Sequence, residues 1–318
     1  IFLGLELFSL ALYLLCIFLP EKRVCQESGL KYFILSSLAS AVMLYGMALL
    51  YGATGTTWLH EMIPHLQPSL VLMIGVVLVA AGLAFKISAV PFHMWVPDVY
   101  QGAPTAVTAF MSVTTKTAAL ATAFRLFPLT LGLAQNNPVL KLEWSVLFWT
   151  LAVITILMGN IMALAQADLK RMLAYSGIAH GGYLLGAIFV GTFAAQKAMI
   201  FYLLAYAFMN VGAFTAIAVL EDEGMEVNTT SLRGLASRYP GVAAALAFCL
   251  FGLTGLPITG GFLAKFNLLG VLLRDGARPL SHYLAVTSIL GSFFGACYYL
   301  RVVAIAYSPG RGEYQANH

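Results

Sequence analysis

The stretch SLVLMIGVVLVAAGLAFKISAVPFHMW (residues 69–95) decides the fold class. Its apolar run is long enough to cross the ~30 Å hydrocarbon core of a bilayer as a helix. Lys86 interrupts the run, and Pro91, which has no backbone N–H to donate, follows five residues later. The stretch therefore predicts a membrane-spanning helix that carries a charge and breaks near its end.

Similar apolar runs recur along all 318 residues, of which 60% are hydrophobic and 9% charged, with a mean hydropathy of +0.87. Soluble domains carry about 25% charged residues. Only helices and closed barrels satisfy every backbone polar group in lipid, and no alternating strand pattern is present. We therefore predict an all-α polytopic membrane protein with a single transmembrane domain of about nine spans, at residues 1–19, 29–51, 69–90, 104–127, 142–165, 171–191, 196–220, 240–273 and 281–307.

A second span, 240–273, is also interrupted. It contains GLTGLP at 252–257, and two glycines then precede Lys265. We expect helix breaks at Pro91 and Pro257. Paired broken helices are typical of transporters built from inverted repeats, so we expect residues 1–127 to be part of a first repeat and residues 142–307 to form a second.

Basic residues alternate between the two sets of loops. The positive-inside rule places the richer set in the cytoplasm. That set comprises Lys22, Arg23, Lys170, Arg171, Arg233, Arg238, Arg301 and Arg311, and the opposite set comprises Lys141, Lys197, Arg274 and Arg278.

No motif for a bound cofactor or metal is present. The sequence lacks GxGxxG after a strand, a P-loop and HExxH, and its four cysteines have no metal-ligand spacing. We therefore expect this chain to bind no redox cofactor. Its net charge of +4 sits in short loops, which excludes nucleic acid as a partner.

Several ionisable residues fall inside the expected spans, where each lysine or acid costs about 2.5–3.5 kcal/mol. A desolvated lysine beside a carboxylate can exchange a proton near neutral pH, so we interpret these residues as a proton path. We expect a Glu6–Lys86 pair, from which Lys116 and Lys265 continue the path, with histidines and water between them. The candidates are Glu6, Lys31, Lys86, Lys116 and Lys265, together with His93 and His180.

Each candidate also has a structural interpretation. Lys31 lies near the start of its span and could extend its amine to the interface. Lys86 and Lys265 could cap carbonyls at the helix breaks. Lys116 could also extend its amine toward the interface, although it lies near the middle of its span. Glu6 could have a structural role, His93 could fasten its broken helix, and His180 could be a buried structural residue.

The motifs themselves resemble a known family. Residues 82–95 (GLAFKISAVPFHMW) are similar to helix seven of the antiporter-like subunits of respiratory complex I, and PDVYQGAPT (97–105) is typical of the subunit N branch, to which mitochondrial subunit 2 belongs. KRMLAYS (170–176), IAHGGY (178–183), GLP (255–257) and GFLAKF (261–266) follow in the family's order. Family members have about fourteen helices arranged as inverted repeats, so this sequence would run from helix five to helix thirteen.

The resemblance implies roles for individual residues. Glu6, Lys86, Lys116 and Lys265 match the family's glutamate of helix five and lysines of helices seven, eight and twelve. Lys31 matches a lysine of helix six, and His93 a histidine just past the helix-seven break. At Gly177 many relatives have serine, and we expect little consequence of that difference.

The resemblance also implies a setting. Such a subunit would move protons in a bacterial inner membrane between neighbouring subunits K and M. NADH oxidation and quinone reduction, with FMN and iron–sulfur clusters, would occur in other subunits. Four alternatives stay open: a subunit of a multi-subunit cation/proton antiporter, a membrane arm of a hydrogenase or plastid complex, an inert scaffold, and an integral-membrane enzyme.

Overall fold

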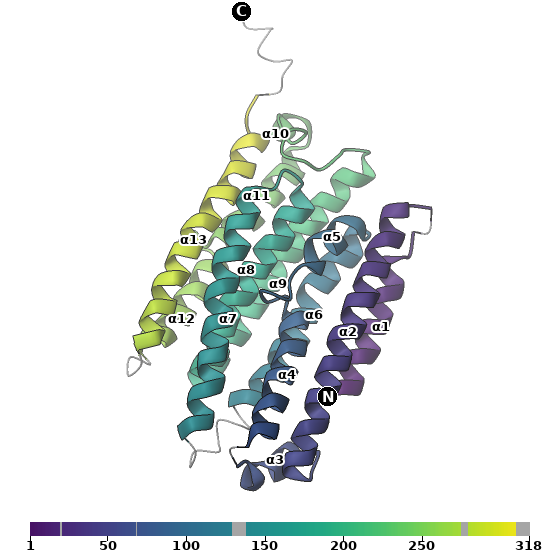
Figure 1. Cartoon of the computed structure of the whole chain (residues 1–318). Coiled ribbons are helices and arrows are strands. Elements are labelled where there is room, and N and C mark those ends of the chain that lie inside the picture. Colours follow the sequence, from purple (N-terminus) through teal and green to yellow (C-terminus); the bar gives the residue numbers. More distant parts are fainter. Residues whose placement is uncertain (20, 68, 129–137, 275–278, 310–318) are drawn as a thin grey trace, which may run out of the picture.

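The computed structural model describes residues 1–19, 21–67, 69–128, 138–274 and 279–309. In these ranges the regular structure is helical, apart from one isolated bridge between Asp168 and Asn228. The long helices run side by side along a common axis (Figure 1). Their bounds are α1 Phe2–Cys16, α2 Arg23–Thr54, α3 Leu59–Met62, η1 Ile63–His65, α4 Leu70–Ile87, α5 Trp95–Gly102, α6 Thr105–Leu126, α7 Pro138–Leu164, α8 Leu169–Val190, α9 Phe193–Asp222, α10 Leu235–Arg238, α11 Pro240–Thr254, α12 Gly260–Arg274 and α13 Pro279–Ala306.

Six of these helices are long and apolar enough to span a membrane, namely α2, α4, the part of α7 from Trp144 to Leu164, α8, α9 and α13. They coincide with six of the expected spans. The other expected spans correspond to α1, to α6, which is rich in threonine and carries Lys116, and to the α11–α12 pair. The predicted all-helical membrane fold is confirmed, and the division into two repeats stays a prediction.

Both predicted helix breaks are present. α4 ends at Ile87, Ser88 adopts a left-handed conformation, and the chain passes through a cis Val90–Pro91 bond before α5 begins at Trp95. The Trp95 indole N–H donates to the carbonyl of Phe85 (3.2 Å), which fastens α5 against α4. The second break separates α11, which ends at Thr254, from α12.

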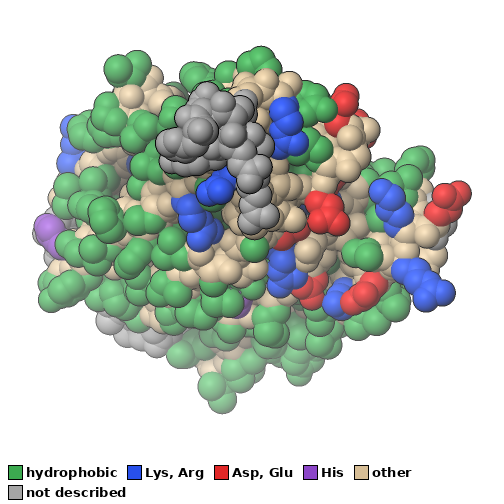
Figure 2. Space-filling view, turned by 90° about the horizontal axis from the view of Figure 1, so that it is seen from above, with side chains coloured by type: hydrophobic (Ala, Val, Ile, Leu, Met, Phe, Trp, Pro, Cys, Tyr) green, Lys and Arg blue, Asp and Glu red, His purple; other side chains and the backbone are tan. Residues whose placement is uncertain are grey.

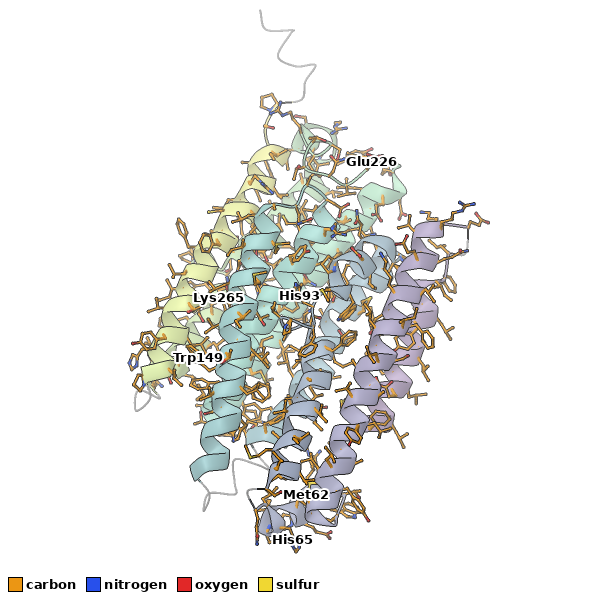
Figure 3. All side chains as sticks on the ribbon, viewed as in Figure 1. Met62, His65, His93, Trp149, Glu226 and Lys265 are labelled. Atoms are coloured by element: carbon orange, nitrogen blue, oxygen red, sulfur yellow. The ribbon has the colours of Figure 1, made fainter. Side chains whose placement is uncertain are left out.

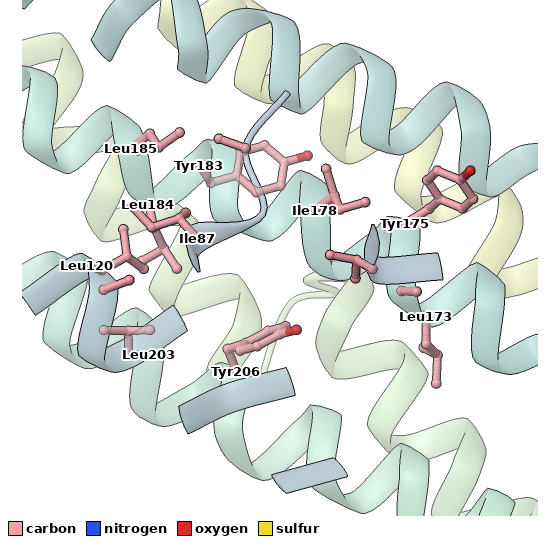
Figure 4. Packing of buried hydrophobic residues seen from close by; sticks show 14 of the residues in the cluster. Ile87, Leu120, Leu173, Tyr175, Ile178, Tyr183, Leu184, Leu185, Leu203 and Tyr206 are labelled. Carbon is pink, nitrogen blue, oxygen red and sulfur yellow. The ribbon is translucent and has the colours of Figure 1, made fainter. Parts of the chain in front are cut away.

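α8 forms the centre of the bundle. Almost all of its residues are buried, because α5, α6, α7, α9, α12 and α13 pack around it. Figure 4 shows this packing, with Leu184 of α8 near Ile87 of α4 and Leu120 of α6. The two helix breaks therefore border a rigid central helix.

Charged side chains gather at one end of the bundle, which Figure 2 views directly. The connections from α1 to α2, from α7 to α8 and from α9 to α11 lie at this end (Figure 1). Most of the richer set of basic residues lies in these connections or in the adjoining helix turns at this end, which agrees with the predicted alternation. Arg278, Arg311 and the side chain of Lys141 lie outside the described residues.

Candidate proton-transfer site

An ion pair joins α1 to the last turn of α4. Lys86 Nζ lies 3.1 Å from Glu6 Oε1, and the lysine side chain is 5% exposed. Lys86 also donates to the hydroxyls of Ser9 (2.7 Å) and Ser36 (3.1 Å), while Ser40 donates to Glu6 Oε1 (2.6 Å). The structure therefore brings Glu6 and Lys86 together as an ion pair, and their role in proton transfer stays a prediction.

The three serines complete the surroundings of this pair. Ser9 donates its own proton to the Leu5 carbonyl (2.7 Å), so its oxygen is free to accept from Lys86. Buried charges are tolerated when they are paired and their remaining hydrogen-bonding capacity is used. The contacts of Lys86 go to a carboxylate and to hydroxyls, which differs from the carbonyl-capping interpretation.

Lys116 of α6 is fully buried. Its Nζ bonds to the Tyr100 hydroxyl of α5 at 3.3 Å. No carboxylate forms an ion pair with Lys116 in the part of the chain that the structure describes. Gly177 of α8 faces it: a Cβ at that position would lie 3.4 Å from Lys116 Nζ and 3.0 Å from the Tyr206 hydroxyl. A side chain at position 177 would thus touch the lysine directly, which the sequence did not indicate.

His180 lies one turn further along α8, inside a cluster of tyrosines. Its Nδ1 is 2.8 Å from the Tyr202 hydroxyl and its Nε2 is 3.3 Å from the Tyr299 hydroxyl. The Tyr299 hydroxyl also contacts Ser176. The His180 ring lies 4.9 Å from the ring of Tyr206. A neutral imidazole has one donor and one acceptor nitrogen, so this histidine can pass a proton between the two hydroxyls by changing tautomer.

Lys265 of α12 lies on the far side of this cluster, where Figure 3 labels it. Its Nζ is 5.5 Å from the ring of Tyr183, which itself lies 5.8 Å from His180. The amine donates to the last carbonyls of α11, at Leu253 (3.1 Å) and Thr254 (2.9 Å). The capping interpretation is therefore correct for this lysine's contacts, and a cation is favourable at a helix C-terminus.

Lys31 and His93 lie apart from the other candidates. Lys31 pairs with Glu27 (2.7 Å) and Asp98 (3.2 Å) and is 43% exposed. Asp98 also accepts from Arg171 (2.6 Å). Burial raises the pKa of Asp98, but these hydrogen bonds from Arg171 and Lys31 outweigh it and hold the pKa below its usual value. His93 lies in the turn between α4 and α5 (Figure 3), and its Nδ1 has no hydrogen-bond partner among the described residues.

Comparisons with known proteins identify the family. The profile of the family described as NADH:quinone oxidoreductase/Mrp antiporter, TM, matches residues 1–294. The chain belongs to this family. NADH-quinone oxidoreductase subunit N of Trichlorobacter lovleyi is 42% identical over 99% of this chain and 64% of its own length. The chain spans less than two thirds of that relative.

Two solved structures have the same fold. A chain of respiratory complex I from Thermus thermophilus superposes with a TM-score of 0.80, at 33% identity, over 99% of this chain and 69% of its own. A chain of the Mrp complex from Dietzia superposes with a TM-score of 0.85, at 24% identity, over 97% of this chain and 56% of its own. The membrane fold is thus shared between redox-driven and antiporter complexes.

Within this family fold, sequence reasoning missed the tyrosine cluster. Tyr202 and Tyr206 stand one turn apart on α9, and Tyr298 and Tyr299 are adjacent on α13. All four are buried. Their presence inside apolar spans was a usable signal, because a buried tyrosine hydroxyl needs a hydrogen-bond partner.

The loop interpretation of Lys170 was wrong. Its side chain is 8% exposed and lies 3.4 Å from Glu221 Oε1. It also donates to the Ala103 carbonyl (3.1 Å) and to the Thr105 hydroxyl (3.0 Å). The side chain points inward because the first turn of α8 packs against the end of α5. Lys170 therefore joins α5, α6, α8 and α9 at the charged end of the bundle.

Proposed function

We propose that this chain moves protons as part of a subunit N of NADH:quinone oxidoreductase, without binding the electron carriers. The single observation that carries the proposal is the buried Glu6–Lys86 pair at the α4 break, with its serine shell. A lysine held there by a carboxylate changes its proton affinity when the pair separates. Two relatives of similar sequence, both named NADH-quinone oxidoreductase subunit N, support the same conclusion.

The proposed path starts at this pair and ends near the α11–α12 break. The proton passes from Lys86 to Lys116, through the hydroxyls around His180, and on to Lys265. Neither Lys116 nor Lys265 has a carboxylate in ion-pair contact within the described ranges. Repulsion between neighbouring positive charges therefore favours one proton advancing when another arrives.

Lys31 and His93 have secondary places in this proposal. Lys31, with Asp98, lies beside a polar hollow of about 200 Å³ at the charged end of the bundle. It would exchange protons with water there. His93 would connect the α4–α5 turn to the Lys86 region.

The resemblance and the relatives suggest the surroundings. We infer that neighbouring subunits of K and M type flank this chain in a bacterial inner membrane, with the charged end in the cytoplasm. FMN, iron–sulfur clusters and quinone would be bound by partner subunits. Among the described residues no group of three histidine, cysteine or acidic side chains is placed to hold a metal ion.

Substitution of Lys86 by alanine tests this function in the assembled membrane complex. Proton uptake into vesicles, per NADH oxidised, should fall at least about tenfold, the effect of removing one proton-transfer group. Lys197→Ala is the matched control, because it removes an exposed lysine at the start of α9. Normal pumping by assembled Lys86→Ala would overturn the proposal and favour an inert scaffold.

A cation/proton antiporter subunit is the second candidate, because the Mrp structure has the same fold. Purification of the complex from its native membrane distinguishes the two. NADH-oxidising activity should accompany the chain under the proposal. A purified complex that exchanges cations for protons without NADH oxidation would favour the antiporter.

A further inference from the structure

A second hydroxyl stands within reach of Lys116. The Tyr206 hydroxyl is fully buried and has no hydrogen-bond partner among the described residues. Leaving a buried hydroxyl unpaired costs about 1–3 kcal/mol. Among the described residues, the Lys116 amine donates to the Tyr100 hydroxyl at 3.3 Å. An amine with three N–H groups can serve either tyrosine.

Gly177 lies beside both Lys116 and Tyr206. The point where its Cβ would be is 3.4 Å from Lys116 Nζ and 3.0 Å from the Tyr206 hydroxyl. Both groups therefore face the same bare stretch of α8 backbone. Because the two distances, 3.4 Å and 3.0 Å, run to one point, the amine and the Tyr206 hydroxyl are at most 6.4 Å apart, and a side chain at position 177 would contact both.

The two tyrosines face different parts of the proposed path. Tyr100 belongs to α5, which continues from the α4 break, and its ring contacts the ring of Trp95 (6.3 Å between centroids). The Tyr206 ring lies 4.9 Å from that of His180, on the side that leads to Lys265. Figure 4 shows Tyr206 beside the central helix. The position of the Lys116 amine thus determines which half of the path it serves.

We propose that Lys116 alternates between Tyr100 and Tyr206, and that Gly177 is the positioning residue that leaves this swing open. The swing changes only hydrogen bonds, since the proton travels on the amine. The proposal rests on the proposed function, and it adds Tyr206 and Gly177 to the path. The amine is protonated from Lys86 while it bonds to Tyr100, and the ammonium gives up that proton toward the acceptor nitrogen of His180 while it bonds to Tyr206.

Three variants of the assembled complex test the swing through proton uptake per NADH oxidised. Tyr206→Phe removes the second partner and should lower pumping about tenfold, as expected for the loss of one hydrogen bond to a charged group. Adding Gly177→Ser to Tyr206→Phe supplies a new hydroxyl beside the amine, so pumping should recover. Adding Gly177→Ala supplies only bulk, so pumping should stay low.

A purely steric role for Gly177 predicts the opposite order, because serine is larger than alanine. Parental pumping by Tyr206→Phe, or recovery with alanine but not with serine, would overturn the swing. The matched control is Tyr298→Phe, which removes a hydroxyl bonded to Asn160 elsewhere in the cluster. Adding Gly177→Ser to Tyr298→Phe should not restore any pumping that Tyr298→Phe has lost. Recovery of pumping in that double variant would also overturn the proposal.

Gly177→Ala and Gly177→Ser alone provide a second measurement should the Tyr206 variant fail to assemble. The swing predicts pumping that is lower for alanine than for serine, and the reverse order refutes it. Lys116→Ala distinguishes a failure of the proposed function from a failure of the swing alone. If it pumps normally, the proposed function fails; if it does not pump but Tyr206→Phe does, only the swing fails.

Discussion

Replacement of Lys170 by methionine should loosen one specific part of the fold. The side chain is 8% exposed, and it holds the Ala103 carbonyl, the Thr105 hydroxyl and the Glu221 carboxylate. A hydrogen bond to a charged group contributes about 1.5–3 kcal/mol. Glu221 is about one third exposed, so water can take over part of its pairing. Losing these contacts together should lower the local stability by about 3 kcal/mol, at the lower end of the cost of breaking a buried ion pair.

The loss is local, so hydrogen exchange measures it best. At about 1.4 kcal/mol per factor of ten, amides in the last turn of α5 and the first turn of α6 should exchange about 100-fold faster. Exchange in α13 should not change, and Lys22→Met, an exposed lysine at the same end, is the matched control. Unchanged exchange in α5 and α6, or a uniform increase along the chain, would refute this account of Lys170.

Two further changes have defined outcomes. Gly255 has a φ of 82°, and a Cβ there would lie 3.1 Å from Lys265 Cδ. Gly255→Ala should thus lower the free energy of unfolding by about 1–2 kcal/mol, because alanine is strained in the left-handed backbone conformation. It should also lower proton pumping by displacing Lys265. Thermal unfolding and proton uptake into vesicles measure these two effects, and a variant unchanged in both would contradict the prediction. Pairing lowers the pKa of Asp98, so its bond to Arg171 should stabilise the fold fully at neutral and mildly acidic pH. That contribution to stability should be lost as the pH falls below the ordinary aspartate range. Asp98→Asn should remove that acid-dependent loss in melting scans, and an identical pH profile would contradict it.

The fold and part of the site could be predicted from the sequence because their signals are local. Apolar length marked the spans, and proline and glycine marked both breaks. Glu6 and Lys86 could be paired because intramembrane charges are few and need partners. The same reasoning predicted Lys116 and Lys265 as members of the path but did not place His180 between them.

The remaining features depend on which helix faces meet. Lys170 reads as a loop charge, and only the packing of α8 against α5 shows that it is buried. The position of Lys31 near the start of its span allowed an amine at the membrane interface, whereas its contact with Asp98 depends on α5 folding back after the break. Gly177 gained a role only when α6 and α9 brought Lys116 and Tyr206 to it.

Proton uptake by Lys116→Met in the assembled complex tests the central claim most directly. Lys116 is fully buried, and an apolar side chain of similar length is tolerated or stabilising in such a position, so the variant should assemble. The account predicts that the complex forms with a normal content of this chain and that uptake per NADH oxidised is lost. Uptake at the parental level in the assembled variant would contradict a proton path through Lys116.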